Sequence, residues 1–178
     1  MKVLHYGMSH NKGGIEVVTM NVYRNIVKEN VEFDFLVCGE RIAFEEEIEE
    51  LGGKVIKITR RRENPIKHYL DYIKFFKDAR GKYDAIHCSY CTLYSITPII
   101  FAKLFRIPKI ILHSRSSDFN TNRWRFKFAH RKNLLIADKI ATDFLACSHL
   151  AAKFMFTPNR YNLGAYKIFR NPVILDNF

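Results

Sequence analysis

Long apolar runs are missing from this sequence of 178 residues. No stretch reaches the roughly 18 to 20 apolar residues that a membrane-spanning helix needs, and the polar segment from Lys2 to Asn11 lacks the apolar centre of a signal peptide. The 4 cysteines are too few for a disulfide framework in a chain of this length. These absences predict a cytoplasmic protein whose thiols stay reduced.

Two common nucleotide-binding motifs are also absent. The sequence contains neither G-x-G-x-x-G nor G-x-x-x-x-G-K-[ST], and it has no internal repeat, low-complexity tract or internal linker. A NAD-type dehydrogenase is disfavoured, because it needs the first motif and the acidic residue that follows it.

Basic residues outnumber acidic ones. The chain has 29 lysines and arginines against 18 acidic residues, which gives a formal charge of +11, and 48% of its residues are hydrophobic. This content is enough to bury one core, and the length suggests one domain. The excess charge predicts an anionic partner, which could be nucleic acid, an acidic membrane surface or a phosphorylated small molecule.

Strand-like and helix-like segments alternate along the chain. Runs rich in strand formers lie at 3–8, 33–39, 54–58, 83–89, 109–116, 143–148 and 165–170. Helical spacing, proline positions or glycine stops predict helices from residue 15 and at 44–51, 64–76, 93–105, 123–140 and 149–156. The alternation predicts an α/β fold, namely a Rossmann-like doubly wound parallel sheet of about seven strands in three α/β/α layers.

A glycine loop joins the first predicted strand to the first predicted helix, with the sequence Ser9-His10-Asn11-Lys12-Gly13-Gly14-Ile15-Glu16. Without a Cβ atom, Gly13 and Gly14 permit positive φ and let a ligand approach the backbone, where the helix N-terminus offers free N–H donors. A Gly-Gly pair is also common in ordinary tight turns. With Ser9 beside it, the loop is a candidate phosphate or sugar site.

Polar side chains end the fourth and fifth predicted strands. His87 and Ser89 end the fourth, and His113, Ser114 and Arg115 end the fifth. Ligands of doubly wound sheets bind at the carboxyl ends of the strands, so these residues are candidates for a site beside the glycine loop. In the alternative, His113 only hydrogen-bonds a loop, His87 points into the sheet as a core residue, and Arg115 is solvated although guanidinium suits phosphate.

The pair Cys88-x-x-Cys91, with Cys147 and His149 further on, raises the possibility of a zinc or redox site. In a Rossmann strand order the fifth strand separates the fourth from the sixth by roughly 9 to 10 Å, whereas Zn–S bonds are ~2.3 Å long. A C-x-x-C motif without a second pair is also a weak indication. We therefore predict neither a metal nor a cofactor.

The predicted helix 123–140 begins with interleaved cations and aromatics, from Arg123 to Lys132. Such a run is usually a solvated helix face, but it also suits nucleic acid or an anionic bilayer. No helix-turn-helix, RNA-recognition or zinc-finger pattern is present, so no nucleic-acid partner is expected. The aromatics, together with the basic residues 60–62 and Lys67, favour peripheral contact with a membrane.

Two stretches carry a resemblance to a known family. Residues 1–6 together with Gly13-Gly14-Ile15-Glu16 resemble the start of family 4 glycosyltransferases. Residues 167–178 resemble the segment in which the chain of these enzymes passes from the N-terminal to the C-terminal domain. The resemblance implies an N-terminal Rossmann-like domain at 1–170 and the start of an interdomain hinge at 171–178. It covers only about half of a two-domain enzyme of the GT-B fold. The resemblance therefore implies that the half that binds the nucleotide-sugar is absent from this sequence.

The resemblance also implies an activity. Members of the family transfer a sugar from a nucleotide-diphosphate sugar with retention and without a metal, here to a sugar or lipid-linked acceptor of surface polysaccharide or glycolipid synthesis at the inner face of the membrane. It implies that His113 orients the reacting sugar, that Gly13 and Gly14 shape the floor of the cleft, and that other residues line the acceptor. Those lining residues are Ser89, Ser114 and Arg115, of which Arg115 replaces a histidine of many relatives. Ser9, His87 and Ser148 are further candidates for binding substrate.

The expected partner of this half is a C-terminal domain, in cis or in trans. The charge that develops as the phosphate departs must be stabilised from both sides of the cleft, so we expect this chain alone to be inactive. The alternative is a free-standing module that binds an anion or a partner without catalysis.

Overall fold

The computed structural model describes residues 1–26, 29–119 and 121–171. Its elements follow one another as β1 (Lys2–Tyr6), α1 (Gly14–Ile26), β2 (Glu32–Cys38), α2 (Glu45–Glu50), β3 (Val55–Ile58), α3 (Pro65–Asp78), β4 (Ala85–Tyr90), α4 (Thr97–Leu104), β5 (Lys109–Ser114), α5 (Trp124–Ile140), β6 (Asp143–Ala146), α6 (His149–Met155), α7 (Pro158–Asn162) and β7 (Lys167–Ile168). Residues 172–178, most of the expected hinge, lie outside the described part.

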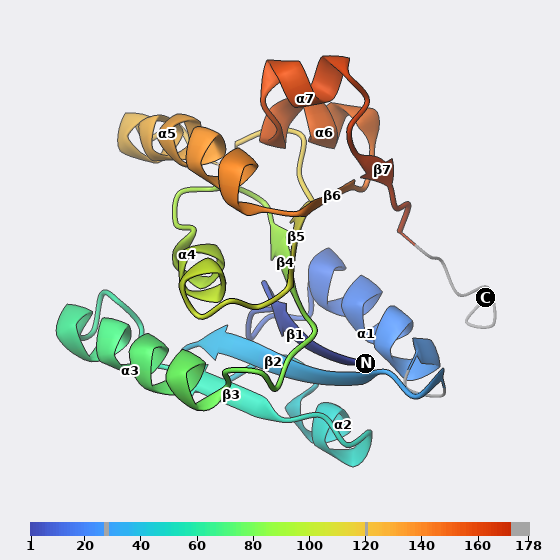
Figure 1. Ribbon diagram of the computed structural model, residues 1–178, viewed down its shortest axis with the longest axis vertical. Helices are drawn as coiled ribbons and strands as arrows, with labels where there is room; N and C mark the ends of the chain where they lie inside the picture. The colour runs from blue at the N-terminus through green and yellow to red at the C-terminus, as the bar shows by residue number, and fades with distance from the viewer. Residues whose placement is uncertain (27–28, 120, 172–178) are drawn as a thin grey trace.

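The strands form one parallel sheet in the order β3-β2-β1-β4-β5-β6-β7. Figure 1 shows α1 and α2 on one side of this sheet and α3, α4 and α5 on the other. Alternate strand residues face the two layers, because successive side chains of a strand point to opposite faces. Val3 and Phe35 pack toward α1 and α2, whereas Leu4 and Ile86 join the larger core under α3 to α6. The predicted Rossmann-like α/β fold is confirmed.

Two helices differ from the prediction. Helix α4 begins at Thr97 rather than residue 93, and Pro98 lies in its first turn, where a proline has no hydrogen bond to lose. The short helix α7 was not predicted, although the dipeptide Thr157-Pro158 is a helix-start pattern. The hydroxyl of Thr157 accepts a hydrogen bond from the backbone N–H of Arg160 and caps this helix.

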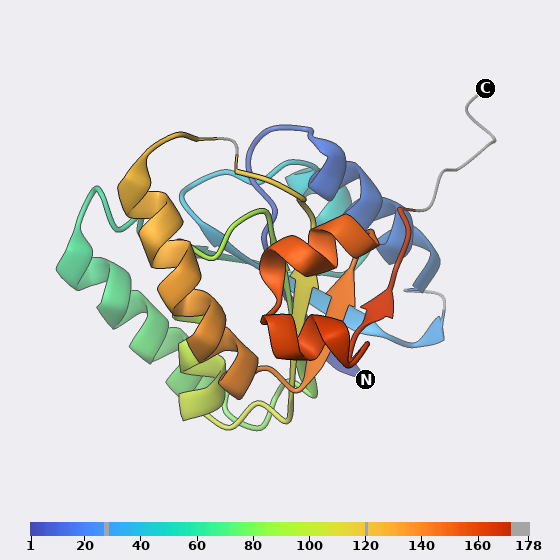
Figure 2. The ribbon, with the colours of Figure 1, turned by 90° about the horizontal axis from the view of Figure 1, so that it is seen from above.

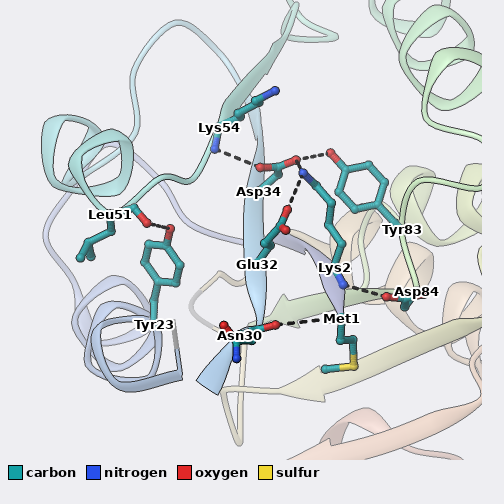
Figure 3. Close-up of polar contacts among 10 residues, drawn as sticks. All are labelled: Met1, Lys2, Tyr23, Asn30, Glu32, Asp34, Leu51, Lys54, Tyr83 and Asp84. Atoms are coloured by element: carbon teal, nitrogen blue, oxygen red, sulfur yellow. Dashed lines mark hydrogen bonds and ion pairs between the residues drawn. The ribbon is translucent and has the colours of Figure 1, made fainter. Parts of the chain in front are cut away.

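A buried carboxylate ties the strands together near their amino ends (Figure 3). Asp34 of β2 is only 3% exposed; it accepts hydrogen bonds from the Tyr83 hydroxyl at 2.6 Å and the Lys54 N–H at 3.0 Å, and pairs with Lys2 Nζ at 3.2 Å. Burial, and then this bond to Asp34, raises the pKa of Tyr83, so the phenol stays a donor. The network is structural and leaves the opposite, carboxyl edge of the sheet for a site.

Candidate functional site

The chain leaves β1 at a glycine that the fold requires. Gly7 has φ of +127°, and a Cβ atom there would lie 2.2 Å from the carbonyl oxygen of Ser89. Gly13 and Gly14 do not adopt the positive φ that their sequence context suggested. A Cβ atom on Gly14 would meet nothing within 4 Å, and one on Gly13 would meet the Glu16 carboxylate at 2.9 Å. Close backbone approach therefore occurs at Gly7, which was not predicted.

The glycine loop is organised around Glu16, which is 5% exposed. Its carboxylate accepts hydrogen bonds from the Ser9 N–H at 2.8 Å, the Ser9 hydroxyl at 2.9 Å and the Gly13 N–H at 3.1 Å. These donors belong to the loop that was the candidate phosphate or sugar site, so a ligand anion there would compete with an internal carboxylate. The spacing from Gly13 to Glu16 is that of a capping box and could have indicated this role.

Histidines of neighbouring strands meet on the α1 side of the sheet. Nε2 of His87 lies 2.9 Å from Nδ1 of His113, and Nη1 of Arg115 lies 3.4 Å from Nε2 of His113. A guanidinium group only donates, so Nε2 of His113 accepts from Arg115. The proton of His113 then sits on Nδ1 and is donated to His87. The structure thus brings together three of the predicted site residues in one hydrogen-bonded row.

Burial determines the charge of this row. It lowers the pKa of His87 to about 4 and that of His113 to about 2, and the positive charge of Arg115 acts in the same direction. Burial also lowers the pKa of His5, which stands beside His87 with the ring centroids 5.2 Å apart. All three imidazoles are neutral at pH 7. They can orient neighbours by hydrogen bonding, but they hold no proton to give as imidazolium ions.

His113 and its neighbour Arg115 differ in how far they are exposed to solvent. His113 is 1% exposed and both of its ring nitrogens are engaged, whereas Arg115 is half-buried. Burial lowers the pKa of the Arg115 guanidinium, and the carboxylate of Glu16 is among the groups that oppose this shift. Arg115 is therefore the outer, charged member of the row and lies near the glycine loop.

The predicted serines divide between the two faces of the sheet. Ser89 is buried on the histidine side, with its hydroxyl 3.4 Å from Nε2 of His5. Ser114 is fully buried on the other side and donates a hydrogen bond to the carbonyl of Ala151 at 2.8 Å. The hydroxyl of Ser148 accepts from the N–H of Ala151 at 3.1 Å and caps α6. Ser114 and Ser148 thus hold helix α6, and neither is brought to the histidine row.

Comparison with known proteins finds a sequence relative that is informative about this chain. The chain is 27% identical over 183 residues to the "Putative glycosyltransferase EpsF" of Bacillus subtilis (strain 168), an alignment that covers 99% of this chain and 46% of that protein. The chain resembles a glycosyltransferase. No protein-family model matches it.

A solved structure supports the fold. The crystal structure of MurG from Acinetobacter baumannii matches 100% of this chain and 48% of its own, with a TM-score of 0.61 and 11% sequence identity. At this identity the match concerns the fold alone. The chain spans about half the length of each of these two proteins.

The cysteines are all free thiols. Cys88 is buried and Cys91 exposed, and β5 separates β4 from β6, as expected for a Rossmann strand order. Within the described residues no three histidine, cysteine or acidic side chains are grouped so that they could hold a metal ion. In the same part of the chain, no helix is long and apolar enough to cross a bilayer.

Proposed function

We propose that this chain is the acceptor-side half of a sugar transferase of glycosyltransferase family 4. In this proposal the enzyme uses a nucleotide-diphosphate sugar, retains the configuration of the sugar, and acts in surface polysaccharide or glycolipid synthesis. The similarity to EpsF over 99% of the chain carries the proposal. It is supported by the row of His87, His113 and Arg115, which meets at the sheet edge where ligands of this fold bind.

Arg115 is the group that we propose to contact the departing phosphate or a sugar hydroxyl. Its guanidinium carries a full positive charge, and a charge in a partly buried site acts more strongly on a developing negative charge than one in water. His113 would position Arg115 through its Nε2 atom. For His113 itself to contact the reacting sugar, Arg115 would first have to turn away. The positive charge of Arg115 supplies stabilisation without a cofactor, and the other half of the enzyme, in cis or in trans, supplies the rest.

A membrane-facing surface belongs to the same proposal. Helices α3, α4 and α5 form one layer on the same side of the sheet (Figure 2), and α4 contacts both of its neighbours. The outer face of α5 exposes Trp124 and Phe128 by 69% and 64%, and α3 exposes Ile66 and Leu70 by 75% and 57%. We propose that this layer rests on an anionic membrane surface at the cytoplasmic side, where a lipid-linked acceptor would be found.

Turnover by the complete two-domain enzyme tests the transferase proposal. The reading frame beyond residue 178 is expressed with this chain, and release of nucleoside diphosphate is measured over a panel of nucleotide-sugars. Arg115→Gln should lower kcat about a hundredfold, since one stabilising donor is worth roughly that much. The exposed Arg80→Gln, at a position outside the proposed site and the membrane-facing helix α5, is the matched control.

Two results would count against the proposal. The first is near wild-type turnover by Arg115→Gln with an unchanged circular dichroism spectrum. The second is sugar transfer by the 178-residue chain alone. A stop codon directly after residue 178, with no second polypeptide that restores turnover, would favour the free-standing binding module instead.

A further inference from the structure

A basic cavity of about 1060 Å³ opens at the carboxyl edge of the sheet, beside the ends of β1, β2 and β3. Five arginines line it, from the loop after β2, the loop after β3 and the start of α5: Arg41, Arg60, Arg61, Arg62 and Arg123. Among the residues that the structure describes, no aspartate or glutamate lines this cavity. A volume of this size is at the upper end for cavities that bury small molecules.

Most of this positive charge is unbalanced. Arg60 pairs with Glu63 at 3.5 Å, but the other four arginines have no carboxylate within 4.0 Å among the residues that the structure describes. Like charges around one hollow raise the local potential and attract an anion. Four free guanidinium groups are matched better by a phosphate or diphosphate, which carries several charges, than by one carboxylate.

The inner wall of the cavity adds an unused polar atom. His68 is only 5% exposed, and its Nδ1 lies 2.7 Å from the carbonyl oxygen of Thr59, so that nitrogen carries the proton and donates. Its other nitrogen, Nε2, has no hydrogen-bond partner in the part of the chain that the structure describes. This nitrogen is therefore open to a hydrogen bond with a ligand in the cavity.

The outer wall is aromatic. Tyr94 is 57% exposed and meets Phe126 edge to face, with ring centroids 5.4 Å apart, and the guanidinium of Arg123 lies 5.9 Å from the centre of the Phe126 ring. Exposed aromatic rings beside cations offer an apolar surface for a sugar ring or a hydrocarbon chain next to its phosphate.

The cavity continues toward the corner where β1 and β4 touch. A smaller hollow of about 170 Å³ shares Tyr6, Gly7, Tyr94 and Ser95 with it and is also lined by Ser89 and Cys91. A ligand held by its phosphate in the basic cavity would therefore extend along these shared side chains to the Gly7–Ser89 contact. This corner is next to the histidine row.

We propose that the basic cavity binds a phosphate or diphosphate group of the acceptor and so directs its sugar to the Gly7–Ser89 corner. That the ligand is an acceptor rests on the proposed function, whereas the binding of phosphate does not. The phosphate could belong to a soluble sugar phosphate or to a lipid-linked diphosphate, because both present the same chemistry to the arginines.

Calorimetric titration of the 178-residue chain tests this without turnover. The probes are inorganic pyrophosphate, glucose 1-phosphate as the soluble source, geranyl diphosphate as the lipid source, and free glucose. Arg61→Gln with Arg62→Gln removes two exposed cavity charges, and Arg125→Gln with Lys132→Gln removes two exposed charges outside it. We expect the cavity pair to weaken pyrophosphate binding about tenfold or more, and the control pair less than about twofold.

The outcomes separate the two proposals. Tighter binding of geranyl diphosphate than of pyrophosphate, which has the same charged group without the hydrocarbon chain, supports the lipid source. Binding of geranyl diphosphate weaker than that of both pyrophosphate and glucose 1-phosphate supports the soluble one. Equal losses in both pairs of variants, or no binding of any phosphate, would overturn the cavity assignment. UDP that binds about tenfold tighter than pyrophosphate and depends on Arg61 and Arg62 would assign the cavity to the donor instead. If phosphate binds in the cavity but the complete enzyme transfers no sugar, only the proposed function fails.

Discussion

The imidazoles of His87 and His113 are stacked, with ring planes 14° apart, centroids separated by 5.2 Å and a hydrogen bond of 2.9 Å between Nε2 and Nδ1. They are not direct partners in the sheet, because His113 is opposite Ser89 and His87 is opposite Ile111. The contact is a diagonal one between neighbouring strands. Protonation of either ring would place a cation against Arg115, so the pair holds together only in its neutral form.

This pair should make stability depend on pH. The pKa of a histidine in the unfolded chain is about 6.5, whereas in the folded protein it is about 4 for His87 and about 2 for His113. Below pH 6.5 the unfolded chain binds more protons, so the free energy of unfolding falls as pH falls through these values. Between pH 7.5 and pH 5 each such histidine should lower the free energy of unfolding by about 2 kcal/mol. Urea unfolding at the two pH values measures this change.

The variant His87→Gln removes one of these groups and should flatten the slope of unfolding free energy against pH. The matched variant His10→Gln changes an exposed histidine and should keep the wild-type slope. A slope that is equal in all three proteins would show that the pair is not neutral in the way the structure indicates.

A second prediction concerns which glycine the fold requires. Gly7→Ala places a Cβ atom 2.2 Å from the Ser89 carbonyl at a φ of +127°, so we expect a loss of about 3 kcal/mol or more. Gly14→Ala meets open space at the start of α1 and should be neutral, or stabilising by up to about 1 kcal/mol. Thermal and urea unfolding of both variants give the comparison, and similar losses in the two would contradict it.

These glycines illustrate what the sequence could and could not reveal. Apolar periodicity is a local property, so it predicted the strands, their alternation with helices and the sheet edge where His87 and His113 meet. The contact between Gly7 and Ser89 joins segments far apart in the chain, and no local pattern marks it. The face of the sheet on which Ser114 and Ser148 lie could be predicted only if the exact strand ends were known, because a shift of one residue moves a side chain to the opposite face.

The buried carboxylate of Asp34 gives a third prediction, about stability alone. Asp34→Ala leaves the Tyr83 hydroxyl and the Lys54 N–H without their acceptor, so unfolding free energy should fall by about 3 kcal/mol. Glu32→Ala removes the other carboxylate near Lys2, but its side chain is 72% exposed and the loss should be about 1 kcal/mol or less. Equal losses in urea unfolding would show that the pairing of Asp34 adds nothing beyond surface charge.

The last prediction concerns the outer face of α5. Trp124, Arg125, Phe128, Arg131, Lys132 and Leu135 are exposed at helical spacing, so apolar and basic side chains share one face. On an anionic bilayer each basic residue near the surface is worth ~1 kcal/mol, and the aromatic rings add apolar burial. Arg125→Gln with Lys132→Gln should therefore weaken binding to phosphatidylserine-containing vesicles by about tenfold to thirtyfold, and added salt should weaken the wild type.

Vesicle sedimentation can separate this surface from the basic cavity. Trp124→Ser with Phe128→Ser should weaken binding while keeping its salt dependence, because the charges remain. Lys54→Gln with Lys82→Gln makes the same change of charge at two exposed positions outside α5 and should bind like the wild type. Since Arg125 and Lys132 lie outside the cavity, the variant with both substitutions should bind vesicles more weakly but bind pyrophosphate as the wild type does. Equal vesicle binding by all of these proteins would remove α5 from the membrane interface and leave its exposed aromatics without a role in the proposed function.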